Sequence, residues 1–327
     1  MRAIFMHTFS SEFHTLQYII TKAERILLMA HSSPDADTVG AVLALKNYSL
    51  GMGKQVDVAC FDPFPEFLKD VVEGIFIVPD RLELTSYDAV IACDSVERGF
   101  HKIVGKLNAG QVTVLIDHHP DINLKGDLSL IDASYSSVCE LLYDFFIATK
   151  TPISKQMATC LALGILGDTG AFQHSNTTAR VMEVASDLMR HGAPVARIIE
   201  SVFSNKKLST LKLWGRAFER AKINQRNGMI VTVVTHEDLV ECGATSDDIA
   251  QVASILNTVP GTKFSLILSE RGNGLVKGSL RSEEYKNTDV SEIAHQFGGG
   301  GHRLASGFEV QGRISETPEG WEIIPGV

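Results

Sequence analysis

Three apolar stretches of the sequence each end on side chains that can bind metal ions or transfer protons. The stretches read "RILLMAH", "YDAVIACD" and "QVTVLIDHH", and imidazole or carboxyl groups lie at or just after the end of each. A fourth segment, "GILGDTGAF", sets an aspartate among glycines after an apolar run. Imidazoles and carboxylates are common ligands of divalent cations and common acids and bases in hydrolysis. The candidate residues are His31, Asp35, Asp37, Asp94, Asp117, His118, His119 and Asp168.

The chemistry of this set favours a pair of metal ions. Carboxylates that pack closely repel one another and raise one another's pKa unless cations neutralise them. Aspartate and histidine ligands without cysteine suit Mn²⁺ or Mg²⁺, and zinc is less favoured. Six such ligands are too many for one catalytic ion with open positions, whereas two ions can share a bridging carboxylate. The two metal ions of such a site lie ~3.5–4 Å apart and bind the attacking and leaving oxygens of a phosphoryl transfer.

Each candidate residue also has a purely structural explanation. A single aspartate after a strand is often a helix N-cap, which would account for Asp94 and Asp37. The run 117–119 could be a solvated turn, and Asp168 could belong to a glycine-rich turn. These explanations must all hold independently, and they leave His31 and Asp35 unexplained. We therefore favour the metal site over the structural explanations.

The segments that carry these residues are predicted to meet at one edge of a sheet. Residues 25–31, 54–61, 87–94 and 111–119 are continuously apolar, which is typical of strands that a parallel sheet buries on both faces. Segments with helical periodicity alternate with these strands and continue after the last of them. In open α/β sheets, ligands bind beyond the carboxyl ends of the strands. The predicted helices are residues 11–24, 38–53, 136–149, 153–167 and 177–191.

A second, smaller α+β domain is expected after a helical connector, with the boundary in the polar segment 201–209. Its glycine-dense stretch "FGGGGHRLASG" would let backbone N–H groups approach an anion closely, although a flexible turn explains it equally well. The expected elements are strands at 228–239, 263–271 and 274–282, the last two as an antiparallel pair, a helix at 247–259, and a helix, glycine loop and last strand within 289–310.

Composition limits the class of protein. A chain of 327 residues with 44% apolar composition can form two domains. Its net charge of −9 is spread along the chain, which argues against a broad basic face that tracks long nucleic acid. We find no signal peptide and no apolar run near the ~18 residues of a membrane span, so we expect a cytoplasmic protein. The five cysteines lack CxxC spacing, which favours buried reduced thiols.

Five motifs, in this order, resemble those of a known family. "HSSPDADTVGA", "ACDS", "IDHHPD" and "GDTGAF" resemble the four motifs of the DHH superfamily of phosphoesterases, and "GGGGHRLASG" resembles the signature of its associated C-terminal domain. The architecture is similar to the nanoRNase branch, also called bifunctional oligoribonuclease and 3′-phosphoadenosine-5′-phosphate (pAp) phosphatase. The resemblance implies an α/β catalytic domain over 1–196, a helical linker over 197–215 and a substrate-binding α+β domain over 216–327. The active site would lie in the cleft between the two domains.

The resemblance also implies a role for each site residue. His119 would contact the scissile phosphate or assist the leaving oxygen, and Asp117 would orient a neighbouring histidine. Asp94, His118 and His119 would be the catalytic residues. One metal ion would be held by Asp37, Asp94, His118 and Asp168, and the other by His31, Asp35 and the bridging Asp94. The nucleotide that is not cut would be bound by Arg281, Gly299, Gly300, Gly301 and His302.

The expected activity is therefore metal-dependent phosphodiester hydrolysis. Two divalent ions, with Mn²⁺ preferred and Mg²⁺ or Co²⁺ as alternatives, would activate the attacking water. The expected substrates are short oligoribonucleotides and linear dinucleotides such as pGpG and pApA, with pAp as a further substrate. Long duplex nucleic acid and membranes are not expected as partners, and a homodimer is compatible with the resemblance. A stand-alone cyclic-di-AMP phosphodiesterase and a non-catalytic nucleotide sensor are the alternatives.

Overall fold

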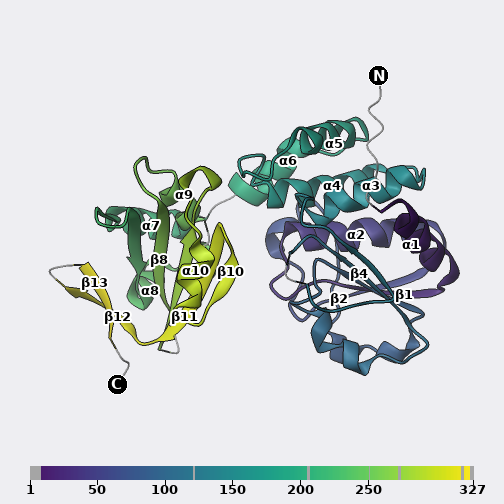
Figure 1. Cartoon of the computed structure of the whole chain (residues 1–327), viewed down its shortest axis with the longest axis horizontal. Helices are drawn as coiled ribbons and strands as arrows, with labels where there is room; N and C mark the ends of the chain where they lie inside the picture. The colour runs from purple at the N-terminus through teal and green to yellow at the C-terminus, as the bar shows by residue number, and fades with distance from the viewer. Residues whose placement is uncertain are drawn as a thin grey trace. The chain divides into compact units, whose positions relative to one another are not determined.

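The chain forms two compact units, Met1–Asn205 and Lys206–Val327. The computed structural model describes residues 9–120, 122–204, 207–249, 251–271, 274–317 and 320–324. The first unit has helices packed on a parallel sheet, and the second has a mixed sheet with shorter helices (Figure 1). Each unit is described in turn.

A five-stranded parallel sheet is the centre of the first unit. Its strands are β1 (Arg25–Met29), β2 (Gln55–Ala59), β3 (Ala89–Cys93), β4 (Val112–Asp117) and β5 (Leu128–Ile131). The strand order is β2-β1-β3-β4-β5, and every neighbouring pair is parallel. The prediction of a mostly parallel sheet is confirmed, whereas the edge strand β5 was not predicted.

Both faces of the central strands are buried, which explains why β3 is apolar at every position and β1 at every position after Arg25. Ile26 and Leu28 of β1 belong to the larger hydrophobic core. Leu27 and Met29 belong to a second core on the opposite face, together with Phe100. Successive side chains of a strand point to opposite faces, so a strand that is covered on both sides needs apolar residues at every position.

The long helices of the first unit all contribute to the larger core. Segments between β2 and β3 and between β3 and β4 cover the other face. Ser137, Ser154 and Thr178 act as N-caps, each accepting a hydrogen bond from a backbone N–H three residues later. The helices are α1 (Ser10–Lys22), α2 (Ala36–Gly51), α3 (Val138–Ala148), α4 (Lys155–Asp168), α5 (Ala179–Arg190), α6 (Val195–Ile199) and the π-helical η6 (Glu200–Ser204), with 3₁₀ segments η1 (Glu66–Leu68), η2 (Pro79–Arg81), η3 (Leu84–Ser86), η4 (Phe100–Lys102) and η5 (Val104–Lys106).

Helices α2 and α4 pack closely because glycines line their contact. A Cβ atom added to Gly40 of α2 would overlap the backbone carbonyl oxygen of Cys160 and lie 2.9 Å from Sγ of Cys139. A Cβ added to Gly167 of α4 would lie 2.5 Å from Cβ of Ala36. This close approach brings the start of α2 beside the end of α4, where two of the candidate carboxylates lie.

The second unit is built on a six-stranded sheet in the order β10-β11-β9-β8-β7-β6, in which only β7 and β8 run parallel. The elements are α7 (Leu208–Glu219), β6 (Lys222–Asn224), β7 (Met229–Val234), α8 (His236–Cys242), η7 (Ser246–Ile249), α9 (Val252–Asn257), β8 (Phe264–Arg271), β9 (Leu275–Arg281), η8 (Glu284–Lys286), α10 (Val290–His295), β10 (Gly300–His302), β11 (Ala305–Gln311), β12 (Arg313–Thr317) and β13 (Gly320–Ile324).

The sequence expectations for this unit need three corrections. The strand expected at 228–239 ends at Val234, because Thr235 and Asp238 form a capping box that starts α8. The helix expected at 247–259 is divided into η7 and α9. The strand expected to be the last is followed by the hairpin β12–β13. The antiparallel pairing of β8 with β9 is confirmed.

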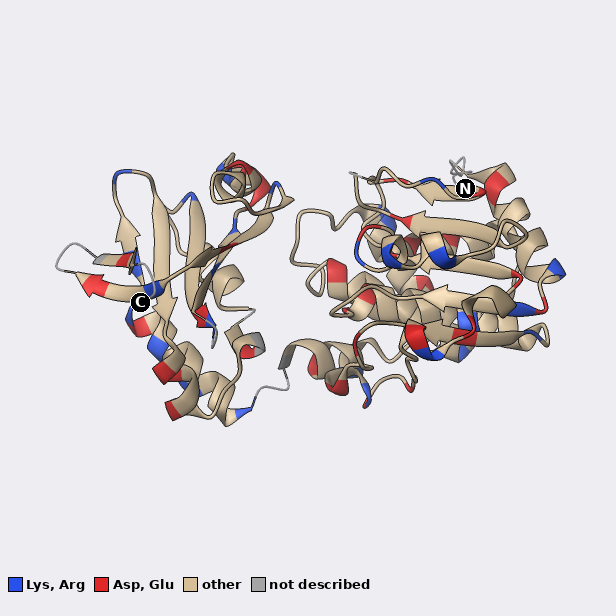
Figure 2. Cartoon of the chain, turned by 90° about the horizontal axis from the view of Figure 1, so that it is seen from below, with Lys and Arg blue, Asp and Glu red and all other residues tan. Residues whose placement is uncertain are grey.

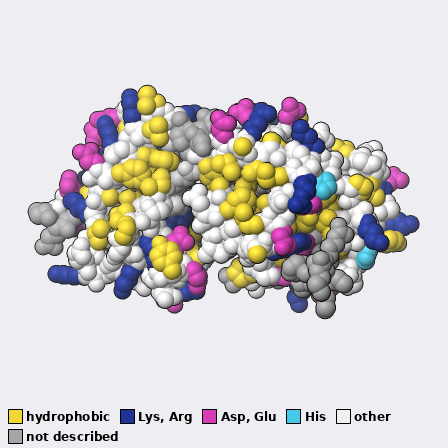
Figure 3. Space-filling view, turned by 90° about the horizontal axis from the view of Figure 1, so that it is seen from above, with side chains coloured by type: hydrophobic (Ala, Val, Ile, Leu, Met, Phe, Trp, Pro, Cys, Tyr) yellow, Lys and Arg dark blue, Asp and Glu magenta, His cyan; other side chains and the backbone are white. Residues whose placement is uncertain are grey.

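The surface mixes charged and hydrophobic side chains. Acidic and basic residues are interspersed over the elements of both units (Figure 2). Hydrophobic side chains are exposed on the face of the first unit that α5 and α6 cover (Figure 3), where Met182 and Met189 of α5 are 50% and 56% exposed. All five cysteines are buried and unpaired, as predicted. None of the helices in the described ranges has both the length and the apolar character that a membrane crossing requires.

We predict that Gly40→Ala destabilises the protein by about 1–3 kcal/mol, since the added methyl group meets backbone atoms that cannot move independently. Gly51→Ala, at the end of the same helix, is the matched control, because no atom lies within 4 Å of the added Cβ. Thermal or urea unfolding of both variants measures the effect. Equal stability of Gly40→Ala and Gly51→Ala would contradict the close packing of α2 on α4.

Candidate metal centre

The carboxyl end of the parallel sheet is the place where the candidate side chains meet. The ends of β1, β3 and β4, the start of α2 and the end of α4 all contribute to it. The structure brings the six predicted metal ligands and His119 into one cluster. In each of three overlapping groups the potential ligand atoms lie within 4.8 Å of one another, and the groups are His31, Asp35 and Asp94; Asp94, His118 and His119; and Asp37, His118 and Asp168.

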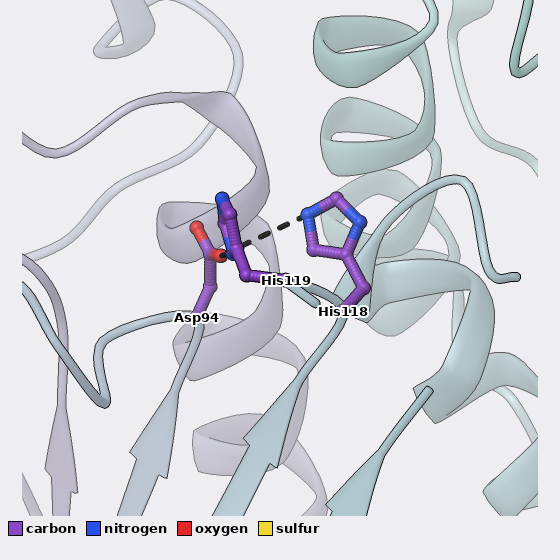
Figure 4. A group of neighbouring side chains, drawn as sticks. All are labelled: Asp94, His118 and His119. Carbon is purple, nitrogen blue, oxygen red and sulfur yellow. Dashed lines mark ion pairs between the residues drawn. The ribbon is translucent and has the colours of Figure 1, made fainter. Parts of the chain in front are cut away.

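Asp94 connects two of these groups (Figure 4). Its Oδ2 atom is 3.3 Å from Nε2 of His31. Its Oδ1 atom is 3.8 Å from Nε2 of His118 and 3.3 Å from Nδ1 of His119. The backbone of Asp94 is left-handed, with φ 54°. Aspartate adopts this conformation more readily than most residues, but it still costs roughly 1–3 kcal/mol, so the turn after β3 is strained where it presents this carboxylate.

The buried ring of His31 is oriented by a backbone carbonyl. Its Nδ1–H donates to the carbonyl oxygen of Ser32 over 2.7 Å, and its Nε2 lies 3.1 Å from Oδ2 of Asp35. Nε2 of His31 and Oδ1 of Asp94 are both buried, and neither forms a hydrogen bond with a described residue. Buried polar atoms without a hydrogen bond are rare, and a bound ion is one of the few explanations for them. The residues present therefore fit a divalent cation.

Asp37 is held by the first turn of a neighbouring helix. Its carboxylate accepts hydrogen bonds from the backbone N–H groups of Val138 (2.7 Å) and Cys139 (3.0 Å) at the start of α3. The N-terminus of a helix carries partial positive charge, which stabilises a carboxylate there. Oδ2 of Asp37 lies 4.0 Å from Nε2 of His118. The fully buried carboxylate is thus fixed by α3 while it faces the cluster.

His118 is oriented by a network that reaches α5. Its Nδ1–H donates to the backbone carbonyl oxygen of Tyr135 over 3.3 Å, and its Nε2 lies 3.2 Å from Oδ2 of Asp168. The hydroxyl of Tyr135 donates to Asp144 over 3.0 Å, and Asp144 forms an ion pair with Arg180 of α5. Contacts of this kind fix the orientation of a ligating imidazole.

Asp117 contacts the two histidines that follow it. Its Oδ1 atom accepts hydrogen bonds from the backbone N–H groups of His118 (2.9 Å) and His119 (3.0 Å). The same atom accepts a third hydrogen bond, from Nδ1–H of His119, over 2.7 Å. Asp117 therefore orients the ring of His119, and it belongs to none of the three groups of potential ligands.

The three imidazoles hold protons strongly in this environment. Burial favours their neutral form, but the carboxylates around them outweigh it and raise the pKa values. The pKa is about 10 for His31, about 10 for His118 and about 9 for His119. Three protonated rings therefore offset the carboxylates at neutral pH when no metal ion is bound.

The pKa values of the carboxylates in the cluster are shifted in opposite directions. Burial opposes the ionisation of Asp94, but its contacts with His119 and His31 hold its pKa well below the usual range. Burial and the nearby charge of Asp168 raise the pKa of Asp37. Burial also raises the pKa of Asp168 itself to about 6. Additional positive charge is therefore needed most between Asp37 and Asp168.

One side chain at this site was not predicted from the sequence. Nη2 of Arg98 lies 3.6 Å from Oδ2 of Asp94 and 3.9 Å from Oδ2 of Asp35. The only sequence signal was its spacing, since Arg98 follows Asp94 by four residues. The backbone N–H groups of Val138 and Cys139 that donate to Asp37 could not be predicted, because any residue type supplies the same N–H group.

The predicted substrate-binding residues lie in the second unit. His302 of β10 pairs with Ala305 of β11, which pairs with Arg281 of β9. Residues that pair directly across antiparallel strands point to the same face of a sheet, so His302 and Arg281 share a face. Burial lowers the pKa of Arg281, and no carboxylate within the described ranges forms an ion pair with it.

The three glycines at 299–301 differ in whether the structure requires glycine at their positions. A Cβ atom at Gly299 would lie 2.6 Å from Cβ of Phe308. Gly301 has φ 136°, a backbone conformation that other residues rarely adopt. Gly300 has more room, because the nearest atom to an added Cβ is Nε2 of His295 at 3.5 Å. Packing and backbone conformation therefore account for Gly299 and Gly301, and they leave Gly300 without a structural reason.

Two family models and several curated relatives match this chain. The N-terminal domain of the DHH family matches residues 25–165, and the DHHA1 domain matches residues 227–319. A Streptococcus mutans protein described as a probable bifunctional oligoribonuclease and PAP phosphatase, NrnA, is 31% identical over 90% of this chain and 92% of its own length. The bifunctional oligoribonuclease and PAP phosphatase NrnA of Bacillus subtilis is 25% identical over 89% of this chain and 91% of its own length.

A solved structure shows the same fold over both units. The crystal structure of an exopolyphosphatase-related protein from Bacteroides fragilis matches with a TM-score of 0.86 and covers 92% of each chain. Its identity to this chain is 24%, so it is evidence of fold alone. The family matches and the relative at 31% identity decide the assignment. The chain therefore belongs to the DHH family of phosphoesterases and contains both its N-terminal domain and the DHHA1 domain.

Proposed function

We propose that this protein is a Mn²⁺-dependent phosphodiesterase that hydrolyses short oligoribonucleotides and linear dinucleotides, such as pGpG and pApA, to nucleoside monophosphates. The observation that carries the proposal is the buried cluster around Asp94, in which Nε2 of His31 and Oδ1 of Asp94 form no hydrogen bond with any residue that the structure describes. The names of the two relatives, oligoribonuclease and PAP phosphatase, support this class of substrate and add pAp to it.

The cluster would hold two divalent cations. Its donors are carboxylate oxygens and imidazole nitrogens, a set that suits Mn²⁺, with Mg²⁺ or Co²⁺ as alternatives. When bound, such a pair supplies the Lewis acidity that makes water nucleophilic at neutral pH. Asp94 would bridge, since its Oδ2 atom faces His31 and its Oδ1 atom faces His118. One site would use His31, Asp35 and Asp94, and the other Asp37, Asp94, His118 and Asp168.

His119 would assist the leaving group. Asp117 accepts a hydrogen bond from Nδ1–H of its ring, and this contact raises the pKa of His119 and so favours the protonated ring. A protonated imidazole beside the scissile phosphate can give its proton to the leaving oxygen as the bond from phosphorus to that oxygen breaks. Asp117 would act through His119 without touching the substrate.

The second unit would bind the nucleotide that is not cleaved. Arg281 is a partly buried cation without a carboxylate partner in the described ranges, and a planar guanidinium suits bidentate binding of phosphate. Gly300, with room around it, would let a backbone N–H group approach the same anion, beside Gly299, Gly301 and His302. In this proposal residues 1–196 form the catalytic domain, 197–215 the helical linker and 216–327 the substrate-binding domain. Because one domain would cleave the substrate while the other binds a nucleotide that is not cleaved, substrate length would be limited, and dinucleotides up to pentanucleotides would be preferred.

A parallel assay separates the proposal from its alternatives. Protein with Mn²⁺ is offered pGpG, pApA, a pentamer RNA, cyclic di-AMP and pAp, and the products are resolved by chromatography. We expect monophosphates from the linear substrates. Dominant turnover of cyclic di-AMP would favour the cyclic-dinucleotide phosphodiesterase, and no turnover at all would favour the nucleotide sensor.

Asp94→Asn is expected to lower turnover in this assay by at least ~10²–10³-fold, because the amide cannot replace a bridging carboxylate. Asparagine tolerates the left-handed backbone of this position, so the fold should survive, which circular dichroism checks. The control is Asp80→Asn, which removes an exposed carboxylate that pairs with Lys106. Activity of Asp94→Asn close to that of the control would exclude a central role for Asp94.

Arg281→Ala is expected to raise KM for pApA by ~10-fold or more, while hydrolysis of an aryl phosphodiester such as bis(p-nitrophenyl) phosphate changes little. The small substrate has no second nucleotide for Arg281 to bind. Steady-state kinetics on both substrates measures the difference. Equal losses on the two substrates would refute the anchoring role.

Binding of Mn²⁺ is expected to release at least two protons per chain at pH 7, because His31 and His118 must give up their protons to become ligands, and Asp37, whose pKa is also raised, adds to the release. Their pKa values are raised to about 10, so the affinity for Mn²⁺ should increase as pH rises from 6 to 9. Calorimetric titration in buffers with different ionisation enthalpies counts the protons. His191→Gln, outside the cluster, should release the same number, and an affinity independent of pH would contradict the assigned ligands.

A further inference from the structure

Arg98 lies beside the cluster without belonging to any of the groups that could bind a metal ion. Its guanidinium is 3.6 Å from Asp94 and 3.9 Å from Asp35, beyond ordinary hydrogen-bond distance. The side chain is 49% exposed, and its guanidinium forms no hydrogen bond with a described residue. Arg98 is thus a cation with unused donors at the edge of an acidic site.

The backbone holds Arg98 in this position. Its carbonyl oxygen accepts a hydrogen bond from the N–H of Ser32 over 3.0 Å, which ties the segment to the end of β1. The hydroxyl of Ser95 donates to the carbonyl oxygen of Met29 over 2.7 Å, and a Cβ atom at Gly99 would lie 3.1 Å from the carbonyl oxygen of Ala30. The segment 95–99 is therefore packed directly on β1, and the backbone of Arg98 has little freedom to move away.

Bound cations would compete with Arg98 for its two carboxylate partners. Asp94 and Asp35 are the carboxylates that the group with His31 offers to a metal ion. Once they ligate a cation, their charge is neutralised and their attraction for Arg98 weakens. The guanidinium carries five N–H donors, which would then be available to an anionic substrate, and a guanidinium can bind phosphate oxygens in pairs.

We infer that Arg98 is a further catalytic residue, which donates hydrogen bonds to the non-bridging oxygens of the scissile phosphate. This inference rests on the proposed function. Arg98 transfers no proton and forms no covalent bond, and it stabilises the negative charge that these oxygens carry as the phosphorus is attacked. It complements Arg281, because Arg98 acts on the phosphate that is cut and Arg281 on a phosphate that is not.

The test compares Arg98→Gln with wild type on bis(p-nitrophenyl) phosphate at saturating Mn²⁺. We expect kcat to fall ~100-fold, with partial recovery in Arg98→Lys, which keeps the charge but loses the planar pair of donors. Added guanidinium salt should restore part of the activity of Arg98→Gln. Arg190→Gln, at an exposed arginine of α5, is the control and should match wild type. A kcat of Arg98→Gln within about twofold of wild type would overturn the inference.

Two binding measurements distinguish this role from support of the metal site. Mn²⁺ should bind Arg98→Gln at least as tightly as wild type, because a neighbouring positive charge has been removed. Inorganic phosphate should bind the Mn²⁺-loaded variant ~10-fold more weakly or worse. Weaker Mn²⁺ binding, or unchanged phosphate binding, would contradict the inference. The wild-type protein could hydrolyse no phosphodiester while Arg98→Gln still binds phosphate more weakly than wild type. In that case the proposed function fails, but the contact between Arg98 and phosphate stands.

Discussion

Carboxylates that face one another away from water repel, and Asp37, Asp94 and Asp168 are in this situation. Ionised groups of this kind persist in proteins only when opposite charge lies beside them. In the absence of metal ions that charge comes from protonated imidazoles, since His31 and His118 have pKa values of about 10. Divalent cations would take over the same task, and the rings would then be neutral ligands. The positive charge that the cluster needs would therefore come from protons in one state and from cations in the other.

The fold of the first unit is what brings these charges together. A parallel sheet aligns the carboxyl ends of β1, β3 and β4, so side chains that are far apart in sequence meet at one edge. Thr38 links two of these ends, because its hydroxyl accepts from the N–H of His31 over 3.3 Å and donates to the carbonyl oxygen of Cys93 over 3.0 Å. The glycine contact between α2 and α4 and the left-handed turn at Asp94 add the remaining constraints. The left-handed backbone at Asp94 thus lowers stability locally while it fixes the position of a site residue.

Much of this arrangement could be predicted from the sequence. Continuous apolar runs indicate buried parallel strands, and polar groups at their ends indicate a ligand site, so the convergence of the residues from His31 to Asp168 was foreseeable. Arg98 was not, because its approach to Asp94 depends on how the segment 95–99 packs on β1. The edge strand β5 is only four residues long and has little pattern to detect. The start of α8 could have been predicted, since Thr235 and Asp238 have the spacing of a capping box.

The central claim is that six side chains converge on a pair of divalent cations. The most direct measurement is the anomalous difference map of a crystal grown with Mn²⁺. The account predicts two peaks ~3.5–4 Å apart, with Asp94 between them and the other five ligands around them. Absence of any peak at this edge of the sheet with saturating Mn²⁺, or peaks bound by other residues, would contradict it.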